Sequence, residues 1–169
     1  YKKIWKTDKI FPLSQISIIQ KGSSITKEKT VEGSIPVVAG GQEPAYYHNV
    51  SNRDANVITV SASGAYSGFL NYWEQPIFAS DCNTIISKDE KTISTKLLFE
   101  FLKSIQTVFY QLQRGQAQPH VYASDIEKIK IPLPPKTVQE KIITEIETLE
   151  KKEKAGREKV ESLSQNVLN

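Results

Sequence analysis

Apolar residues recur at intervals of four and three along the last part of the chain, at Ile142, Ile146, Leu149, Val160, Leu163 and Val167. This spacing is typical of a coiled-coil seam, and Glu153 and Gly156 interrupt it at seam positions. Glycine lowers helix stability by about 1 kcal/mol relative to alanine, but at a seam it lets two backbones approach closely. We expect one long helix whose seam packs on the globular part, on an antiparallel helix or on a second copy of the chain.

The start of this helix is marked by the residues around its first turn. Pro134 and Pro135 end the preceding segment, because proline lacks the N–H that a regular backbone ladder needs. Thr137 is a residue type that caps helices, and Glu140 three positions later completes a capping box. An unbroken helix over residues 136–169 would be about 50 Å long.

The preceding residues have short apolar runs that are typical of strands, together with one helical repeat. Strands are expected within residues 1–20, 35–39, 56–61, 69–73, 76–86 and 129–133. Helical spacing is found at Leu98, Leu102, Ile105, Phe109 and Leu112. That repeat predicts an amphipathic helix over residues 95–113, which Gly115 ends. The whole pattern predicts an α+β domain with a mixed sheet over residues 1–135, followed by the coiled-coil-type helix.

Length and composition narrow the class of protein. A chain of 169 residues suits one domain with a core, and no apolar run approaches the roughly 20 residues that cross a bilayer. Cys82 is the only cysteine, so no internal disulfide can form and a cytoplasmic location is expected. The chain begins at Tyr1 and contains no methionine. We therefore expect a piece of a longer polypeptide, or a chain whose initiator has been lost.

The positive charge of the chain is mild and lies in its globular part. Residues 1–135 hold 15 Lys and Arg against 12 Asp and Glu, a balance of +3, whereas residues 136–169 hold 7 of each. This distribution is compatible with DNA binding. It is far from the basicity of a protein that binds DNA alone.

Three polar segments between glycines hold the residue types that bind DNA. Gln and Asn suit adenine edges and Arg suits guanine, whereas Lys, Ser and Thr suit phosphates. We name residues 40–49 the first loop, 61–68 the second loop and 114–120 the third loop. The candidate DNA-contacting residues in and near them are Lys21, Lys27, Gln42, Tyr46, Tyr47, His48, Asn49, Arg53, Ser63, Tyr66, Ser67, Arg114, Gln116, Gln118 and His120.

Several of these residues also have a purely structural explanation. Tyr46 and Tyr47 are residue types that pack at the rim of a domain. Ser63 and Ser67 can satisfy the backbone of a turn. Arg114 follows a predicted helix and can complement its C-terminal dipole.

The sequence offers no constellation of residues for catalysis. An adenine methyltransferase needs Asn or Asp before two prolines and an aromatic residue after them, which residues 133–136 lack. Residues 89–91 are of the types that bind magnesium in nucleases, but they fall in a charged turn. His48, Cys82 and His120 are too scattered for a zinc site. We therefore expect no catalytic residue, metal or cofactor in this chain.

A resemblance to a known family covers nearly the whole chain. Its strongest part runs from Gly115, Gln118 and Pro119 through residues 129–135 to residues 139–142. These residues resemble the end of a target-recognition domain in the specificity subunits of Type I restriction-modification enzymes, and in the related halves of fused restriction-methylation enzymes. Looser matches lie at residues 22, 33–36, 61–64, 68 and 81–83. The family often has Glu-Gln at the helix start where this chain has Gln-Glu, a change that preserves the capping.

The resemblance implies a DNA-binding specificity module without catalysis of its own, which binds one half of a split site through the major groove. In such systems, paired helices space two recognition domains and dock methyltransferase subunits. The implied partners are double-stranded DNA, an adenine methyltransferase that is separate or fused, and a second recognition domain or second copy of the chain. A restriction subunit is a further candidate partner. S-adenosylmethionine is expected on the methyltransferase, and no membrane is implied.

Two other classes of function stay open. A coiled-coil adaptor that binds only protein would be insensitive to changes at Arg114, Gln118 and Tyr66, and would lose its assembly on changes at Ile146 and Leu149. A hydrolase or nuclease with an unfamiliar site would cleave DNA in a metal-dependent way. Salt dependence separates the DNA reader from the adaptor, because phosphate contacts release counterions.

Overall fold

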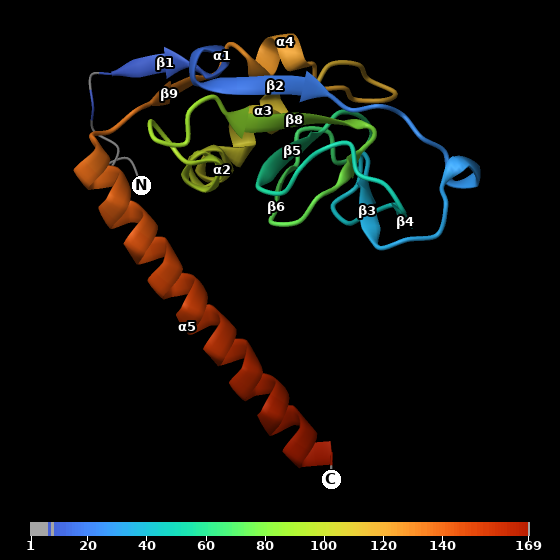
Figure 1. The fold of residues 1–169 in the computed structure, drawn as a ribbon, viewed down its shortest axis with the longest axis vertical. Coiled ribbons are helices and arrows are strands. Elements are labelled where there is room, and N and C mark those ends of the chain that lie inside the picture. The colour runs from blue at the N-terminus through green and yellow to red at the C-terminus, as the bar shows by residue number, and fades with distance from the viewer. Residues whose placement is uncertain (1–6, 8, 169) are drawn as a thin grey trace. The chain divides into compact units, whose positions relative to one another are not determined.

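A computed structural model of the chain describes residue 7 and residues 9–168, with side chains as far as residue 165 in the last helix. The chain divides into two compact units, residues 1–133 and residues 134–169. The strands are β1 (Ile10–Pro12), β2 (Ser17–Lys21), β3 (Ile35–Val38), β4 (Tyr46–His48), β5 (Val57–Ser61), β6 (Leu70–Trp73), β7 (Phe78–Ala79), β8 (Cys82–Ser87) and β9 (Lys130–Pro132) (Figure 1). The helices are α1 (Leu13–Ile16), the 3₁₀ turn η1 (Lys27–Lys29), α2 (Thr95–Ser104), α3 (Gln106–Gln111), α4 (Ala123–Ile126) and α5 (Lys136–Leu168).

An antiparallel sheet in the order β2-β8-β5-β6 forms the centre of the first unit. All five residues of β5 are buried, because both faces of this strand are covered. Val57 belongs to a buried cluster with Val38, Ile77, Ala79 and Cys82 on one face. Side chains alternate along a strand, so Ile58, the next residue of β5, points to the opposite face. On that face α2 packs against β5, β6 and β8.

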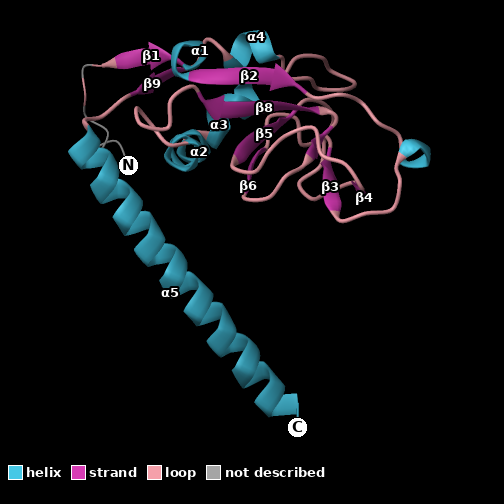
Figure 2. Cartoon of the chain, viewed as in Figure 1, coloured by secondary structure: helices cyan, strands magenta, loops and turns pink. Residues whose placement is uncertain are grey.

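Two smaller sheets complete the first unit. One has the order β4-β3-β7, in which β4 is antiparallel to β3 and β7 is parallel to it. The other pairs β1 with β9 antiparallel, so a strand near the start of the described chain meets the strand that precedes Pro134 and Pro135. The predicted α+β fold with a mixed sheet is therefore confirmed, although the mixed pairing is in the three-stranded sheet. Figure 2 shows how much of this unit consists of loops between short strands.

The predicted helix over residues 95–113 is wrong in its continuity, because Ile105 separates α2 from α3 with backbone angles of −112° and 27°. The break brings Gln106 against the edge strand β6. Its side-chain oxygen accepts a hydrogen bond from the Leu70 N–H at 3.0 Å, and its nitrogen donates to the Gly68 carbonyl at 2.8 Å. Lys103 donates to the Leu70 carbonyl at 3.0 Å, so polar groups at the exposed edge of the sheet are satisfied by side chains. Burial lowers the pKa of the Lys103 amine.

The second unit is the single helix α5, which has the 33 residues expected from the seam pattern. Thr137 is not its N-cap, because the helix begins at Lys136 and Thr137 lies inside the first turn. The Pro135 carbonyl accepts the first bonds, from the N–H groups of Val138 at 2.9 Å and Gln139 at 3.1 Å. Proline is favourable at a helix start, since it lacks only an N–H that would be unpaired there.

The helix continues without interruption through Gly156, and a Glu153–Arg157 ion pair of 2.6 Å crosses that position. Hydrogen bonding to Glu153 raises the pKa of the Arg157 guanidinium. Leu149, Val160 and Leu163 are exposed by 61%, 64% and 55%. A row of exposed apolar side chains is typical of a helix that pairs with another. Ile142 and Ile146 lie earlier on the same helix, and the side chain of Val167 lies outside the described residues.

Within the described part of the chain, none of the helices combines the length and apolar character required to cross a bilayer.

The second loop contains two glycines with positive φ that differ in their surroundings, and they provide a matched test of the fold. A Cβ at Gly68 (φ +88°) would lie 2.8 Å from the Phe109 carbonyl oxygen, whereas a Cβ at Gly64 (φ +81°) would meet no atom within 4 Å. We expect Gly64→Ala to lower the free energy of unfolding by about 1 kcal/mol, from backbone strain alone. Gly68→Ala adds a backbone clash and should cost about 2 kcal/mol more.

Urea denaturation followed by circular dichroism would measure both losses. Equal losses for the two variants would contradict the close packing of the second loop on α3.

Candidate nucleic-acid interface

The predicted loops gather at one end of the four-stranded sheet. Its register pairs Ser61 with Cys82 and Lys21 with Asn83, so β2 and β5 end where β8 begins. The second loop follows β5 at this end (Figure 1). The first loop follows β3 of the three-stranded sheet and the third loop follows α3, so segments from distant parts of the sequence meet at this end.

Backbone hydrogen bonds join the second loop to the third. The Gly64 N–H donates to the Pro119 carbonyl at 3.0 Å, and the Val121 N–H donates to the Ala62 carbonyl at 2.9 Å. Ser63 and His120 also form an isolated antiparallel bridge. Bonds between main-chain atoms fix the relative position of the two loops independently of their exposed side chains.

The first loop meets the second through Gly40 and Gly41. The Ser61 hydroxyl donates to the Gly41 carbonyl at 3.2 Å. A Cβ at Gly40 would lie 2.6 Å from the Ser63 carbonyl oxygen, so a residue without a side chain is needed for this approach. The Ser63 hydroxyl donates in turn to the carboxylate of Asp81. The structure thus brings all three loops together, which sequence patterns alone could not predict.

The third loop is a short hairpin with a closed base. The Arg114 N–H donates to the His120 carbonyl at 2.9 Å, and the His120 N–H donates to the Arg114 carbonyl at 2.8 Å. Gly115, with φ +95°, turns the chain directly after this pair. It does not end the preceding helix as predicted, since α3 already ends at Gln111. Gln116 and Gln118 are exposed on the resulting tip.

The base of this hairpin carries an ion pair as well. A terminal guanidinium nitrogen of Arg114 lies 2.7 Å from a carboxylate oxygen of Asp125, and the other oxygen lies 3.3 Å from Lys128 Nζ. The Asp125 side chain is 9% exposed, whereas that of Arg114 is 65% exposed. The Arg114 guanidinium also lies 6.0 Å from the centre of the Tyr122 ring, on which His120 stacks at 6.2 Å.

The sequence candidates differ widely in exposure. The exposed ones are Lys21, Lys27, Gln42, Tyr47, Asn49, Tyr66, Arg114, Gln116 and Gln118. The partly buried ones are Tyr46, Arg53, Ser63 and His120, and the buried ones are His48 and Ser67. Of these residues, Gln42, Ser63, Tyr66, Gln116, Gln118 and His120 belong to the parts of the three loops that meet.

Two candidates, His48 and Ser67, are buried, and a third, Arg53, is hydrogen-bonded within the protein. His48 is 6% exposed, and its Nδ1 accepts a hydrogen bond from the Val31 N–H at 3.0 Å. Ser67 is fully buried. The guanidinium of Arg53 donates to Thr84 and to the carbonyls of Asn52 and Lys21. We leave these three side chains out of the proposed contacts, because they are already surrounded or bonded by the protein.

The first loop also contains secondary structure that the sequence did not predict. Residues 46–48 form β4, the edge of the three-stranded sheet. The Tyr46 hydroxyl donates to the Ile25 carbonyl, which holds this side chain against residues 22–34. The contacts with the second loop described above come from the start of the first loop, at Gly40 and Gly41.

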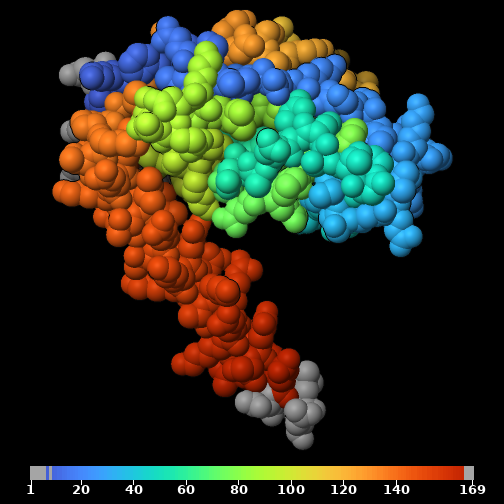
Figure 3. All heavy atoms as spheres, in the orientation of Figure 1, coloured from blue at the N-terminus to red at the C-terminus, as the bar shows by residue number. Residues whose placement is uncertain are grey.

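Several lysines lie outside the loops. Lys21 ends β2, and the following segment, residues 22–34, carries Lys27 and Lys29 on η1. Glu28 lies between them, and hydrogen bonding to its own backbone lowers the pKa of its carboxyl group. This acidic neighbour reduces the positive potential of the turn. Figure 3 shows the segment in light blue at the margin of the first unit.

Residues that position the loops were not among the sequence candidates. Asn83 donates from its side chain to the Val121 carbonyl at 3.2 Å, and Gln113 donates to the Ser67 carbonyl at 2.7 Å. Asp81 binds Ser63 as described above. The family resemblance at residues 81–83 could have indicated Asp81 and Asn83, whereas no sequence pattern marks Gln113.

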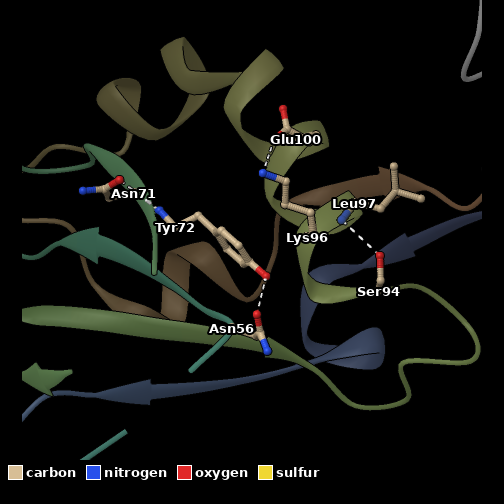
Figure 4. Close-up of polar contacts among 7 residues, drawn as sticks. All are labelled: Asn56, Asn71, Tyr72, Ser94, Lys96, Leu97 and Glu100. Carbon is tan, nitrogen blue, oxygen red and sulfur yellow. Dashed lines mark hydrogen bonds and ion pairs between the residues drawn. The ribbon is translucent and has the colours of Figure 1, made fainter. Parts of the chain in front are cut away.

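A cleft of about 880 Å³ lies toward the other end of the four-stranded sheet, between residues 51–57 and the start of α2. The Tyr72 hydroxyl donates to the side-chain oxygen of Asn56 at 3.0 Å, and Lys96 lies 3.6 Å from the carboxylate of Glu100 (Figure 4). Burial, opposed in part by Lys96, raises the pKa of Tyr72. These polar groups bind one another, so we place the candidate interface at the loop end instead.

Among the described residues, no group of three or more His, Cys, Asp or Glu side chains is arranged to hold a metal ion.

Comparison with known proteins identifies the family of the chain. Residues 5–162 match the family model of the Type I restriction modification DNA specificity domain. The chain belongs to this family. The resemblance predicted from the sequence is therefore confirmed.

Solved structures of specificity subunits share the fold of this DNA specificity domain. The S subunit of a Type I restriction-modification system from M. genitalium has a TM-score of 0.77 and 21% identity, over 85% of this chain and 39% of its own. The HsdS subunit from Thermoanaerobacter tengcongensis has a TM-score of 0.64 and 16% identity, over 87% of this chain and 38% of its own. A chain from a structure on complex assembly and conformational transition of the type I R-M system has a TM-score of 0.68 and 14% identity, over 87% and 39%.

The specificity domain described here spans about two fifths of the length of these relatives. No curated protein matches the chain in sequence.

The single thiol of this specificity domain has a testable property. Cys82 is 1% exposed at the start of β8, and burial raises the pKa of its thiol to about 12. The thiolate is the reactive form, and raising a thiol pKa keeps it protonated at all lower pH values. We expect iodoacetamide at pH 8 to label the native chain far more slowly than the urea-unfolded chain.

Mass spectrometry of timed samples would measure both labelling rates. Equal rates would mean that the Cys82 thiol is accessible in the native chain, which would contradict its burial at the start of β8.

Proposed function

We propose that this chain is a target-recognition unit of a bacterial restriction-modification enzyme, in which the first unit binds one half of a split DNA site and α5 is the spacer. The observation that carries the proposal is the convergence of three polar loops at one end of the sheet in a DNA specificity domain. The proposed contacts to bases come from Gln42, Tyr66, Gln116 and Gln118.

The chemistry of these side chains suits the major groove. A glutamine amide carries a donor and an acceptor in one plane, so it can bind adenine through both. Gln116 and Gln118 lie on a hairpin whose base is closed by two backbone bonds, which limits the entropy lost when they bind. Lys21 and Lys27 are exposed on the chain that leaves β2 and are proposed to bind phosphates.

The second unit is proposed to act in assembly. Leu149, Val160 and Leu163 are exposed along α5 and would be buried by a second helix, from another recognition domain or another copy of the chain. The paired helices would set the distance between two half-sites and dock a DNA adenine methyltransferase, either separate or fused. One solved relative is described in terms of complex assembly of a type I system, which supports this role.

The chain is proposed to supply binding energy and register but no chemistry. Methylating an adenine requires the base to leave the stack and enter a pocket of the methyltransferase. S-adenosylmethionine would therefore be bound by that partner. A restriction subunit would act on the same assembly.

A map of adenine methylation across the host genome would test the proposed function. We expect deletion of the coding region for residues 1–135 to abolish methylation at one defined motif, and a motif in two separated parts would fit a split site. An unchanged map in a host with an active methyltransferase would overturn the proposal.

Loop variants would then locate the contact with the DNA. We expect Gln116→Ala and Gln118→Ala each to weaken binding to a duplex with that motif by about tenfold, since a bidentate base contact contributes about 1–3 kcal/mol. Gln75→Ala is the matched control, because Gln75 is exposed in the turn after β6, at the other end of the sheet. Fluorescence anisotropy measures all three, and equal losses would refute the placement of the interface.

A further inference from the structure

Asp125 places a buried negative charge beside the surface that is proposed to face DNA. It is 9% exposed and lies 2.7 Å from Arg114, at the base of the third loop. A negative charge there opposes phosphate binding and partly neutralises the arginine. A role for Asp125 in binding DNA rests on the proposed function of this loop end.

The position of Asp125 is well fixed by its surroundings. Its N–H donates to the Tyr122 carbonyl at 3.0 Å, and the next residue, Ile126, is the fully buried last residue of α4. The carboxylate is therefore a fixed point on the body of the first unit. Arg114, by contrast, belongs to the loop, and its side chain is 65% exposed.

The ion pair thus connects the hairpin base to the body of the domain. The two backbone bonds between Arg114 and His120 close the hairpin on itself, and backbone bonds of Pro119 and Val121 join it to the second loop. The Arg114–Asp125 ion pair adds a contact to α4 on the side of the hairpin base. Tyr122 lies between these groups, with the Arg114 guanidinium and the His120 ring near it. The contact is an ion pair that lacks the geometry of a hydrogen bond, so it acts through the attraction between a buried carboxylate and a guanidinium that always carries its charge.

We propose that Asp125 is a positioning residue for DNA recognition: it holds Arg114 as a strut, and the strut fixes the orientation of Gln116 and Gln118. On this proposal Arg114 is not itself a phosphate contact. Reading a base edge requires side chains to be held within a fraction of an ångström, so a loosened hairpin would lose specificity before it lost charge attraction.

The two possible roles of Asp125 predict effects of opposite sign. If Asp125 only competes with phosphates for Arg114, Asp125→Asn removes a repulsive charge and binding becomes tighter. If Asp125 positions the hairpin, the same variant weakens binding to the recognised motif. We expect the full chain with Asp125→Asn to bind a duplex with the mapped motif about tenfold more weakly, and a scrambled duplex as well as or better than wild type.

Arg114→Gln provides a second variant, at a side chain that is 65% exposed. We expect the same loss of affinity for the motif, and a salt dependence like that of wild type. A slope reduced by about one counterion would mean that Arg114 binds a phosphate directly, and would overturn the proposal. The double variant should be no weaker than either single one, because both remove the same strut.

Lys128→Gln is the matched control. Lys128 contacts the other oxygen of the same carboxylate, at 3.3 Å, and is 74% exposed. Lys128→Gln removes one positive charge, as Arg114→Gln does, but keeps the Arg114–Asp125 ion pair. Affinity for the motif should therefore change less than twofold. A loss equal to that of Arg114→Gln would show that net charge, not position, is what matters.

Hydrogen exchange in the free chain tests the strut without any DNA. In Asp125→Asn and Arg114→Gln, the amides of Arg114 and His120 should exchange about tenfold faster, while those of β5 (Val57–Ser61) stay unchanged. Unchanged exchange at the hairpin base would overturn the positioning role. If wild type binds no duplex, the proposed function fails, and the exchange rates still decide whether Asp125 holds the hairpin.

Discussion

The position of β8 between β2 and β5 is the constraint on which the candidate interface depends. Its register places Cys82 opposite Ser61 and Asn83 opposite Lys21, which brings the ends of two other strands together. A slip of one residue would turn every side chain of the strand to the opposite face. Cys82 would then leave its buried cluster, and Asn83 would lose the Val121 carbonyl that it binds. Burial on both faces therefore fixes the strand end from which the second loop leaves and on which the other two loops pack.

At this end of the sheet, the loops are held together mainly by main-chain hydrogen bonds and by close approach at glycines. Pro119 is bonded to Gly64, and Gly40 approaches the backbone of Ser63. This arrangement separates two requirements. The backbone supplies a fixed frame, whereas exposed side chains such as Gln116 and Tyr66 can differ without loss of the frame.

The sequence predicted elements whose stability comes from local pattern, and failed where a distant contact decides. The β-branched run of β5 and the seam of α5 were found because their periodicity is carried by neighbouring residues. The break at Ile105 was missed because it goes with the contacts of Gln106 to Leu70 and Gly68, which helical periodicity does not register. β4 was missed because a short edge strand after a glycine turn has too few residues for a pattern.

The same distinction applies to the candidate site. Loop composition correctly indicated polar residues at the surface, but His48 and Ser67 have the same chemistry and are buried. The function of Asp125 in the strut depends on Arg114, eleven positions earlier in the sequence, and no pattern connects the two. Family resemblance located residues 81–83 without a role. Geometry supplied the role, since the Asp81 carboxylate binds the hydroxyl of Ser63.

Charge sets a limit on what one unit can do alone. A balance of +3 over the first 135 residues, with few exposed lysines near the loops, supplies little of the counterion release from which DNA affinity is built. A unit of this kind gains affinity when it is linked to a second one, because the second contact is then made at a high effective concentration. The exposed seam of α5, at Leu149, Val160 and Leu163, is the part of the chain suited to such a link. On the proposed function, weak binding by each half would be an advantage, since only DNA with both half-sites at the right spacing would be held.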